Sequence, residues 1–103
     1  MKFLLMTESR DPMPPDMAMP MLDMMTAWLS EHRASGKLLD SWSYAGRPGG
    51  GGLLEVDSHE ELDAIMTGFP FGQTSTISVY PLADLDAALA NAKKMFETMM
   101  SGG

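Results

Sequence analysis

The first strand-like segment of the chain is apolar on both faces, and this feature constrains the fold more than any other. Residues 2–7 (KFLLMT) have the composition of a β-strand. Successive side chains of a strand point to opposite faces, so Phe3 and Leu5 share one face. Leu4 and Met6 share the other face. A sheet built around this strand therefore needs cover on both sides.

A helix is predicted from Asp16, a common N-cap residue type, to about Ser35. Gly36 is a typical residue just after a helix C-terminus. Pro20 is compatible with this helix only near its first turn. Apolar side chains recur at three- to four-residue spacing and predict one buried stripe. The stripe consists of Met21, Met25, Trp28, Leu29 and His32.

Two further strands and a helix are expected next. The segment 38–44 (LLDSWSY) alternates as a strand does, and a third strand is expected from about Gly52 to Val56. The alternation places four side chains of the earlier strand on one face, namely Leu38, Asp40, Trp42 and Tyr44. Ser58 and Glu61 form a capping box, which predicts a helix that ends near Gly68.

The last two elements are a strand over 75–80 (STISVY) and an amphipathic helix over 84–100. The order β-α-β-β-α-β-α matches, in its first six elements, the ferredoxin-like split β-α-β arrangement. Its two helices cover one face of the sheet. A second subunit whose sheet packs on the other face would cover the rest, so we expect residues 1–103 to form one domain of a dimeric α+β barrel.

Composition argues against several classes of partner. The formal net charge is −7, whereas binding to nucleic acid or to an anionic membrane surface requires clustered Lys and Arg. The chain has no cysteine, which excludes disulfides and thiolate metal sites. Its N-terminal apolar run is shorter than that of a signal peptide. We therefore expect a cytoplasmic protein whose partners are a small molecule and further copies of itself.

Several short motifs resemble the muconolactone isomerase family, over roughly Gly36 to Tyr80. They are G-x5-W-x-x-A-G (Gly36, Trp42, Ala45, Gly46), the following Glu55-Val56-x-Ser58-x-Glu60, and the Phe-Pro-Phe turn at 69–71. The opening MKFLLM and the later RASGKLL are similar to the wider dimeric α+β barrel group, which includes the YCII-related proteins. The resemblance implies a reaction that removes a proton from one carbon of a small lactone acid and returns it at another, without a metal or an organic cofactor.

The chain departs from the pattern of that family at several positions. It has Met24 and Met25 where the isomerases carry acidic residues, and Asp40 and Arg47 where they carry histidines. The run Gly49–Gly52 replaces aromatic and polar residues. The resemblance therefore implies a substrate other than muconolactone.

The candidate catalytic residues are His32, Asp40 and Tyr44. If the first helix packs antiparallel on the second strand, His32 and Asp40 lie at the same height. A carboxylate that orients an imidazole makes a general acid/base, and Tyr44 could donate a hydrogen bond to an oxyanion. The alternatives are an imidazole that only packs, a structural ion pair and an edge tyrosine.

The candidate substrate-binding residues are Met25, Trp28, Trp42, Arg47 and Gly51. Met25 belongs to a methionine-rich segment suited to an apolar cavity, and the two tryptophans form an aromatic wall or part of the core. Arg47 either clamps a carboxylate or is an ordinary surface arginine. The glycine run leads into a strand, so it is not a phosphate loop. It forms either a flexible turn or a shaved-back cavity wall.

These residues predict an isomerase or cyclase that moves protons on a largely apolar substrate bearing a carboxylate or an enolate. A non-catalytic ligand-binding barrel and a cofactor-independent monooxygenase are the alternatives. Fold alone does not choose among them.

Overall fold

The computed structural model describes residues 1–102 and contains one antiparallel sheet with three helices. The elements are β1 (Lys2–Ser9), α1 (Pro15–Ala34), β2 (Leu38–Ser43), β3 (Gly49–Glu55), α2 (His59–Thr67), β4 (Ser75–Leu82) and α3 (Leu85–Ser101). The strand order is β2-β3-β1-β4, with every neighbouring pair antiparallel. This confirms the predicted α+β class and the ferredoxin-like order of the first six elements.

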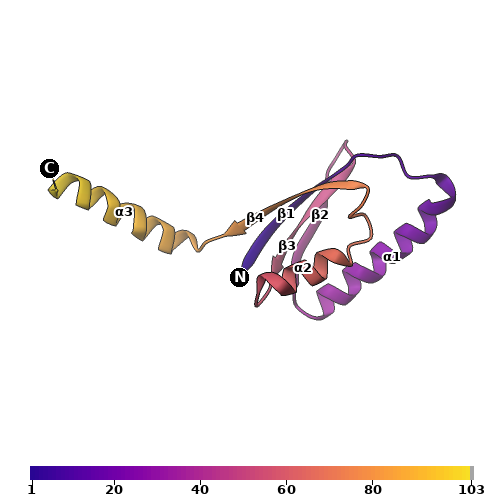
Figure 1. Cartoon of the computed structure of the whole chain (residues 1–103), viewed down its shortest axis with the longest axis horizontal. Coiled ribbons are helices and arrows are strands. Elements are labelled where there is room, and N and C mark those ends of the chain that lie inside the picture. Colours follow the sequence, from indigo (N-terminus) through magenta and orange to yellow (C-terminus); the bar gives the residue numbers. More distant parts are fainter. Residues whose placement is uncertain (103) are drawn as a thin grey trace.

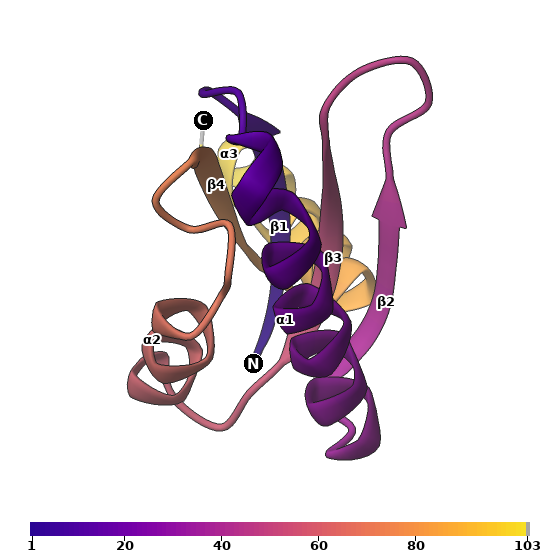
Figure 2. The same cartoon turned by 90° about the vertical axis from the view of Figure 1, so that its right-hand side faces the viewer.

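The helices α1 and α2 lie on the same side of the sheet (Figures 1 and 2). The core fills the space between these helices and the sheet, and its members are Phe3, Leu5, Trp28, Leu38, Leu54, Val56 and Ile65. The predicted stripe of α1 is confirmed, because Trp28 is buried and the other four members are half-buried. On the other side of the sheet, which we call the open face, none of the helices in residues 1–102 lies against the strands (Figure 1).

The ends of the helices follow local sequence chemistry, with one correction. In α2 the Ser58 hydroxyl accepts a hydrogen bond from the Glu61 backbone N–H at 3.1 Å, as the capping box predicts. In α1 the N-cap is Pro14 and the helix begins at Pro15, so the prediction of Asp16 as N-cap was wrong. Proline at the first helical position has no N–H to leave unpaired and a backbone angle suited to a helix.

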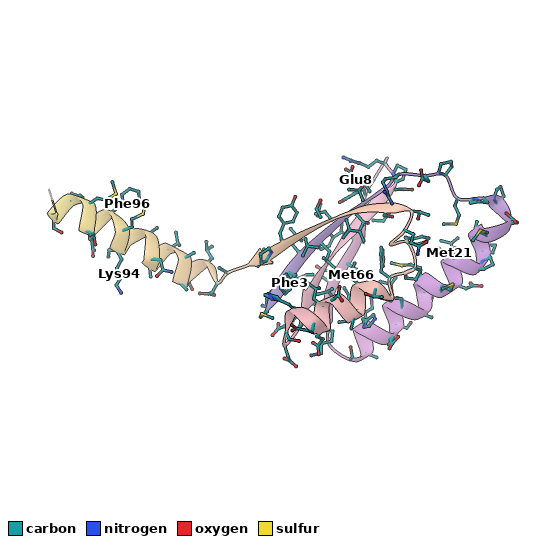
Figure 3. All side chains as sticks on the ribbon, in the orientation of Figure 1. Phe3, Glu8, Met21, Met66, Lys94 and Phe96 are labelled. Atoms are coloured by element: carbon teal, nitrogen blue, oxygen red, sulfur yellow. The ribbon has the colours of Figure 1, made fainter. Side chains whose placement is uncertain are left out.

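The helix α3 projects away from the rest of the molecule (Figure 1). Its apolar side chains are exposed, including Leu85, Leu89, Phe96 and Met99. Phe96 and Lys94 extend from opposite sides of the helix (Figure 3). Within residues 1–102, neither this helix nor the other two are long and apolar enough to cross a membrane.

A salt bridge ties α2 to the start of β2. Lys37 Nζ lies 2.9 Å from Glu61 Oε1 and 3.3 Å from Asp57 Oδ2. The hydrogen bond with Lys37 is the main cause that holds the pKa of Glu61 below its ordinary 4.5, and the same bond raises the pKa of Lys37. The lowered pKa of Glu61 means that its contribution to stability is present above pH 4.5 and is lost as pH falls through the folded-state value.

We therefore expect Glu61→Gln to unfold at lower urea concentration than the parent protein near pH 7. The difference should shrink on acidification below about pH 4.5, where the parent carboxylate also becomes neutral. Urea unfolding at a series of pH values measures this, with Glu60→Gln on the exposed side of α2 as the control. If the difference in urea midpoint between Glu61→Gln and the parent stayed constant down to pH 2.5, the stabilising role of the ionised Glu61 carboxylate would be contradicted.

Candidate active site

A cavity of about 580 Å³ lies between the sheet and the two helices that cover it. Its walls come from α1, α2, the loops at 9–13 and 69–74, and the helix-facing sides of the strands. The volume falls within the range of small-molecule sites in proteins. Of the predicted substrate-binding residues, four line this cavity, namely Met25, Trp28, Trp42 and Gly51.

The wall that faces the sheet is apolar and partly aromatic. The Trp28 indole is buried, lies 5.1 Å from the Phe69 ring in an edge-to-face arrangement, and donates its Nε1–H to the Ile65 carbonyl oxygen at 3.2 Å. Met25 and Met66 complete this wall from α1 and α2. Because the indole N–H is already paired inside the protein, Trp28 offers a bound molecule an apolar surface.

The floor of the cavity is the glycine-rich half of β3. All four residues Gly49–Gly52 belong to the strand and line the cavity, so the alternative that they form a flexible turn was wrong. The strand also begins at Gly49 rather than near Gly52 as predicted. Strand pairing explains the earlier start. Gly50–Gly52 are paired with β1 on one side and with β2 on the other, and this pairing fixes the backbone of the glycines in a strand conformation.

Close approach of neighbouring atoms requires glycine at three of these positions. A Cβ atom would clash with the Thr7 carbonyl oxygen at Gly49 and with the Trp42 carbonyl oxygen at Gly50. A Cβ atom at Gly51 would lie 2.7 Å from the Leu5 carbonyl oxygen and from Cε2 of the Trp42 indole. Gly49 has a φ of +132°, which L-residues rarely adopt. Gly52 differs, because its Cβ would meet the end of the Leu38 side chain at 3.2 Å and the Asp40 carbonyl oxygen at 3.4 Å. A methyl group at Gly52 would therefore fit if the end of the Leu38 side chain shifts slightly.

Two charged side chains line the cavity, and sequence reasoning missed both of them. Arg33, near the end of α1, donates from Nη2 to the Ser41 hydroxyl of β2 at 2.8 Å. Asp11, in the loop after β1, is the one carboxylate residue among residues 1–102 that lines the cavity. Arg33 follows Leu29 by four positions, so helical spacing alone would have placed it beside the apolar stripe.

The structure does not bring His32 and Asp40 together. No hydrogen bond or ion pair within residues 1–102 joins them, and Asp40 Oδ1 instead accepts from the backbone N–H of Ser41 at 2.8 Å. The strand register shifts between Leu38 and Asp40, so the expected sharing of one face by Leu38 and Asp40 was wrong. Leu38 packs in the core, whereas Asp40 is exposed.

His32 lies beside the cavity wall rather than in it. Its ring centroid is 4.8 Å from that of Trp28, in an edge-to-face arrangement. The imidazole therefore packs against the Trp28 indole. This is the packing alternative for His32, and the geometry gives it no carboxylate partner within the described chain.

Tyr44 and Arg47 lie on the open face, away from the large cavity. They line a separate hollow of about 350 Å³ together with Met6, Glu8, Thr76, Ser78 and Tyr80. Arg47 forms an ion pair with Glu8, and its guanidinium carbon lies 5.4 Å from the centre of the Tyr44 ring. The Tyr44 hydroxyl is 3.8 Å from the Met6 sulfur. The sheet therefore separates Tyr44 and Arg47 from the buried Trp28.

Comparison with known proteins identifies relatives of this arrangement. The family model described as muconolactone delta-isomerase matches residues 1–88. The crystal structure of a muconolactone isomerase superposes with a TM-score of 0.72 at 22% identity, covering 82% of this chain and 90% of that one.

A second solved structure is 5-chloro-2-hydroxyhydroquinone dehydrochlorinase from Burkholderia phenoliruptrix AC1100, in complex with 2,5-dihydroxybenzoquinone. It has a TM-score of 0.61 at 17% identity, covering 84% of this chain and 98% of that one. No curated protein sequence matches. At these identities the two structures establish the shared fold, and the family match covers most of the chain. The protein therefore belongs to the muconolactone delta-isomerase family.

Proposed function

We propose that this protein is an isomerase that moves a proton within a largely apolar substrate bound between the helices and the sheet. The substrate carries a carboxylate, and an enolate forms on it during the reaction. The observation that carries the proposal is the cavity itself, because an apolar and aromatic lining is combined with one cation, Arg33, and one carboxylate, Asp11. Family membership supports the same class of reaction.

Arg33 is the group that would hold the substrate carboxylate. Its guanidinium makes one hydrogen bond, to a neutral hydroxyl, and forms no ion pair with a carboxylate within residues 1–102. It therefore keeps donors for an acid group, which a guanidinium binds through two parallel hydrogen bonds. Arg47, the residue expected to do this, is already paired with Glu8 on the open face.

Asp11 is the group that would move the proton. In the ionised form it accepts a proton from a carbon next to a carbonyl group, and the electron pair of the broken C–H bond passes into an enolate. The resulting Asp11 carboxylic acid returns the proton at a different carbon, which restores the carboxylate and completes the isomerisation. The flanking walls, including Trp28 and Met25, limit water around the enolate.

The two solved structures support a ring substrate with an enolisable oxygen. One is of a muconolactone isomerase, and the other holds 2,5-dihydroxybenzoquinone in a dehydrochlorinase. For this chain we propose a cyclic acid of that general chemistry rather than muconolactone itself.

Hydrogen exchange in D₂O tests the proposal without knowledge of the natural product. The protein is incubated with muconolactone and with benzo-fused lactone acids, and proton NMR follows the replacement of ring C–H by deuterium. We expect the protein to accelerate exchange of at least one acid. Binding of these acids without any acceleration would favour the non-catalytic ligand-binding barrel and overturn the proposal.

We also propose that a second copy covers the open face of the sheet. Large apolar side chains are exposed there, including Tyr80 and Leu82, and a chain of 103 residues gains stability from burying them. The exposed apolar side of α3 offers further surface to the same partner.

We expect light scattering to give at least twice the monomer mass at micromolar concentration. Replacement of Tyr80 with lysine should shift the protein toward the monomer, because a charge would be buried in the interface. Replacement of the exposed Met24 on α1 with lysine is the control. A parent protein that is monomeric at these concentrations would contradict this association.

A further inference from the structure

The floor of the cavity has no side chains over four successive residues. Over Gly49–Gly52 the strand presents peptide groups without side chains, along about 13 Å of its length at the usual rise per residue. An ordinary strand would place a side chain into the cavity at every second residue. A planar ring system can therefore touch this backbone over its whole face, whereas a thick, saturated ring system touches it only through its protruding hydrogen atoms.

The charged groups lie at different levels along this floor. The Arg33 guanidinium donates a hydrogen bond to the Ser41 hydroxyl. Ser41 is paired with Gly52 across β2 and β3, and Gly52 is paired with Leu5 across β3 and β1, so Arg33 lies at the level of Leu5. Asp11 follows the end of β1 at Ser9. The four residue steps from Leu5 to Ser9 correspond to about 13 Å along the strand direction, so the backbone of Asp11 begins beyond that level. A single five-membered ring is shorter than this separation.

The opposite wall suits a flat apolar molecule. Trp28 and Phe69 present aromatic surface, and Met25 and Met66 are flexible side chains that adjust to the outline of a ligand. Met66 extends from α2 on the side of the sheet that holds the cavity (Figure 3).

We propose that the cavity binds a planar acid of two or more fused rings, with its carboxylate on Arg33 and its rings on the Gly49–Gly52 floor, and that Gly52 determines this specificity. The proposal rests on the proposed function, because it names the substrate class of the same site. The fused rings extend from Arg33 toward Asp11, so the far ring lies closer to the group that moves the proton than a single ring would.

The first test compares ligands on the unmodified protein by isothermal titration calorimetry. The ligands are benzoate, 2-naphthoate and decahydronaphthalene-2-carboxylate, of which the last has the carbon skeleton of naphthoate in a thick, saturated form. We expect 2-naphthoate to bind at least about tenfold more tightly than either of the others, since only it covers the flat floor. Equal or tighter binding of the saturated acid would overturn the proposal, because an ordinary apolar cavity prefers the larger apolar surface.

The second test changes the floor. Gly52→Ala places a methyl group where the nearest atom is the movable end of the Leu38 side chain, so the strand can keep its pairing. We expect it to weaken naphthoate binding by at least about fivefold and benzoate binding by less than twofold. Gly68→Ala is the matched control, because the new Cβ would lie 3.6 Å from its nearest neighbour and outside the cavity. If Gly52→Ala does not fold, the comparison of the three acids on the parent protein still tests the preference for planar rings.

The failure of this inference and the failure of the proposed function have different signatures. A protein that accelerates deuterium exchange on lactone acids but binds planar and saturated acids equally well would overturn the fused-ring specificity alone. A protein that prefers naphthoate but accelerates no exchange would overturn the isomerase proposal alone.

Discussion

Replacement of Asp11 with asparagine is expected to lower the rate of deuterium exchange on the best lactone acid by about 10²- to 10⁴-fold, the usual contribution of a positioned proton carrier. Asparagine has nearly the same shape but cannot accept and return a proton at neutral pH. Because Asp11 sits in a loop and no described hydrogen bond involves its carboxylate, folding and ligand affinity should change little.

The control for this substitution is Asp16→Asn, which alters a carboxylate in the first turn of α1 outside the cavity. NMR exchange rates under saturating ligand, together with calorimetric affinities, separate a chemical effect from a binding effect. An Asp11→Asn protein that exchanges deuterium at close to the parent rate would remove Asp11 from the mechanism. His32, which contacts Trp28 on α1, would then be the next candidate for the proton carrier.

Replacement of Trp28 with alanine is expected to destabilise the protein by about 3–5 kcal/mol, the range for deleting a buried aromatic side chain. The indole is 8% exposed and packs against both Phe69 and His32. Its loss also leaves the Ile65 carbonyl oxygen of α2 without its hydrogen-bond donor. Small domains have about 5–15 kcal/mol of stability in total, so this change threatens the folded state.

Trp28→Phe separates packing from hydrogen bonding. It keeps most of the ring and removes the donor, so we expect a cost of about 1–3 kcal/mol from the unpaired carbonyl and the smaller ring together. Urea unfolding followed by far-UV circular dichroism measures both variants. A Trp28→Ala protein that loses less than about 1 kcal/mol would contradict the central position of Trp28 in the core.

Local patterns predicted the elements that depend on neighbouring residues. Ser58 and Glu61 define the start of α2 through a local hydrogen bond. The spacing of apolar residues from Met21 to His32 identifies the buried side of α1 independently of the sheet. These features need no information from distant parts of the chain.

The errors arose where tertiary pairing decides the outcome. Alternation in 38–44 gives no sign of the register shift after Leu38, yet this shift moves Asp40 to the opposite face from the residue two positions before it. The glycine run looks like a turn in isolation and becomes the centre of a sheet through its pairing with β1 and β2. The sequence around Arg33 is typical of an exposed helix residue, and only the packing of α1 on β2 brings its guanidinium next to Ser41.

A crystal structure with a bound lactone acid tests the central claim most directly. The acid is the one whose hydrogen exchange the protein accelerates most. We predict density for its rings over Gly50–Gly52, with the carboxylate within hydrogen-bond distance of the Arg33 guanidinium. Density in the hollow lined by Tyr44 and Arg47 on the open face, with the helix-side cavity empty, would contradict the account.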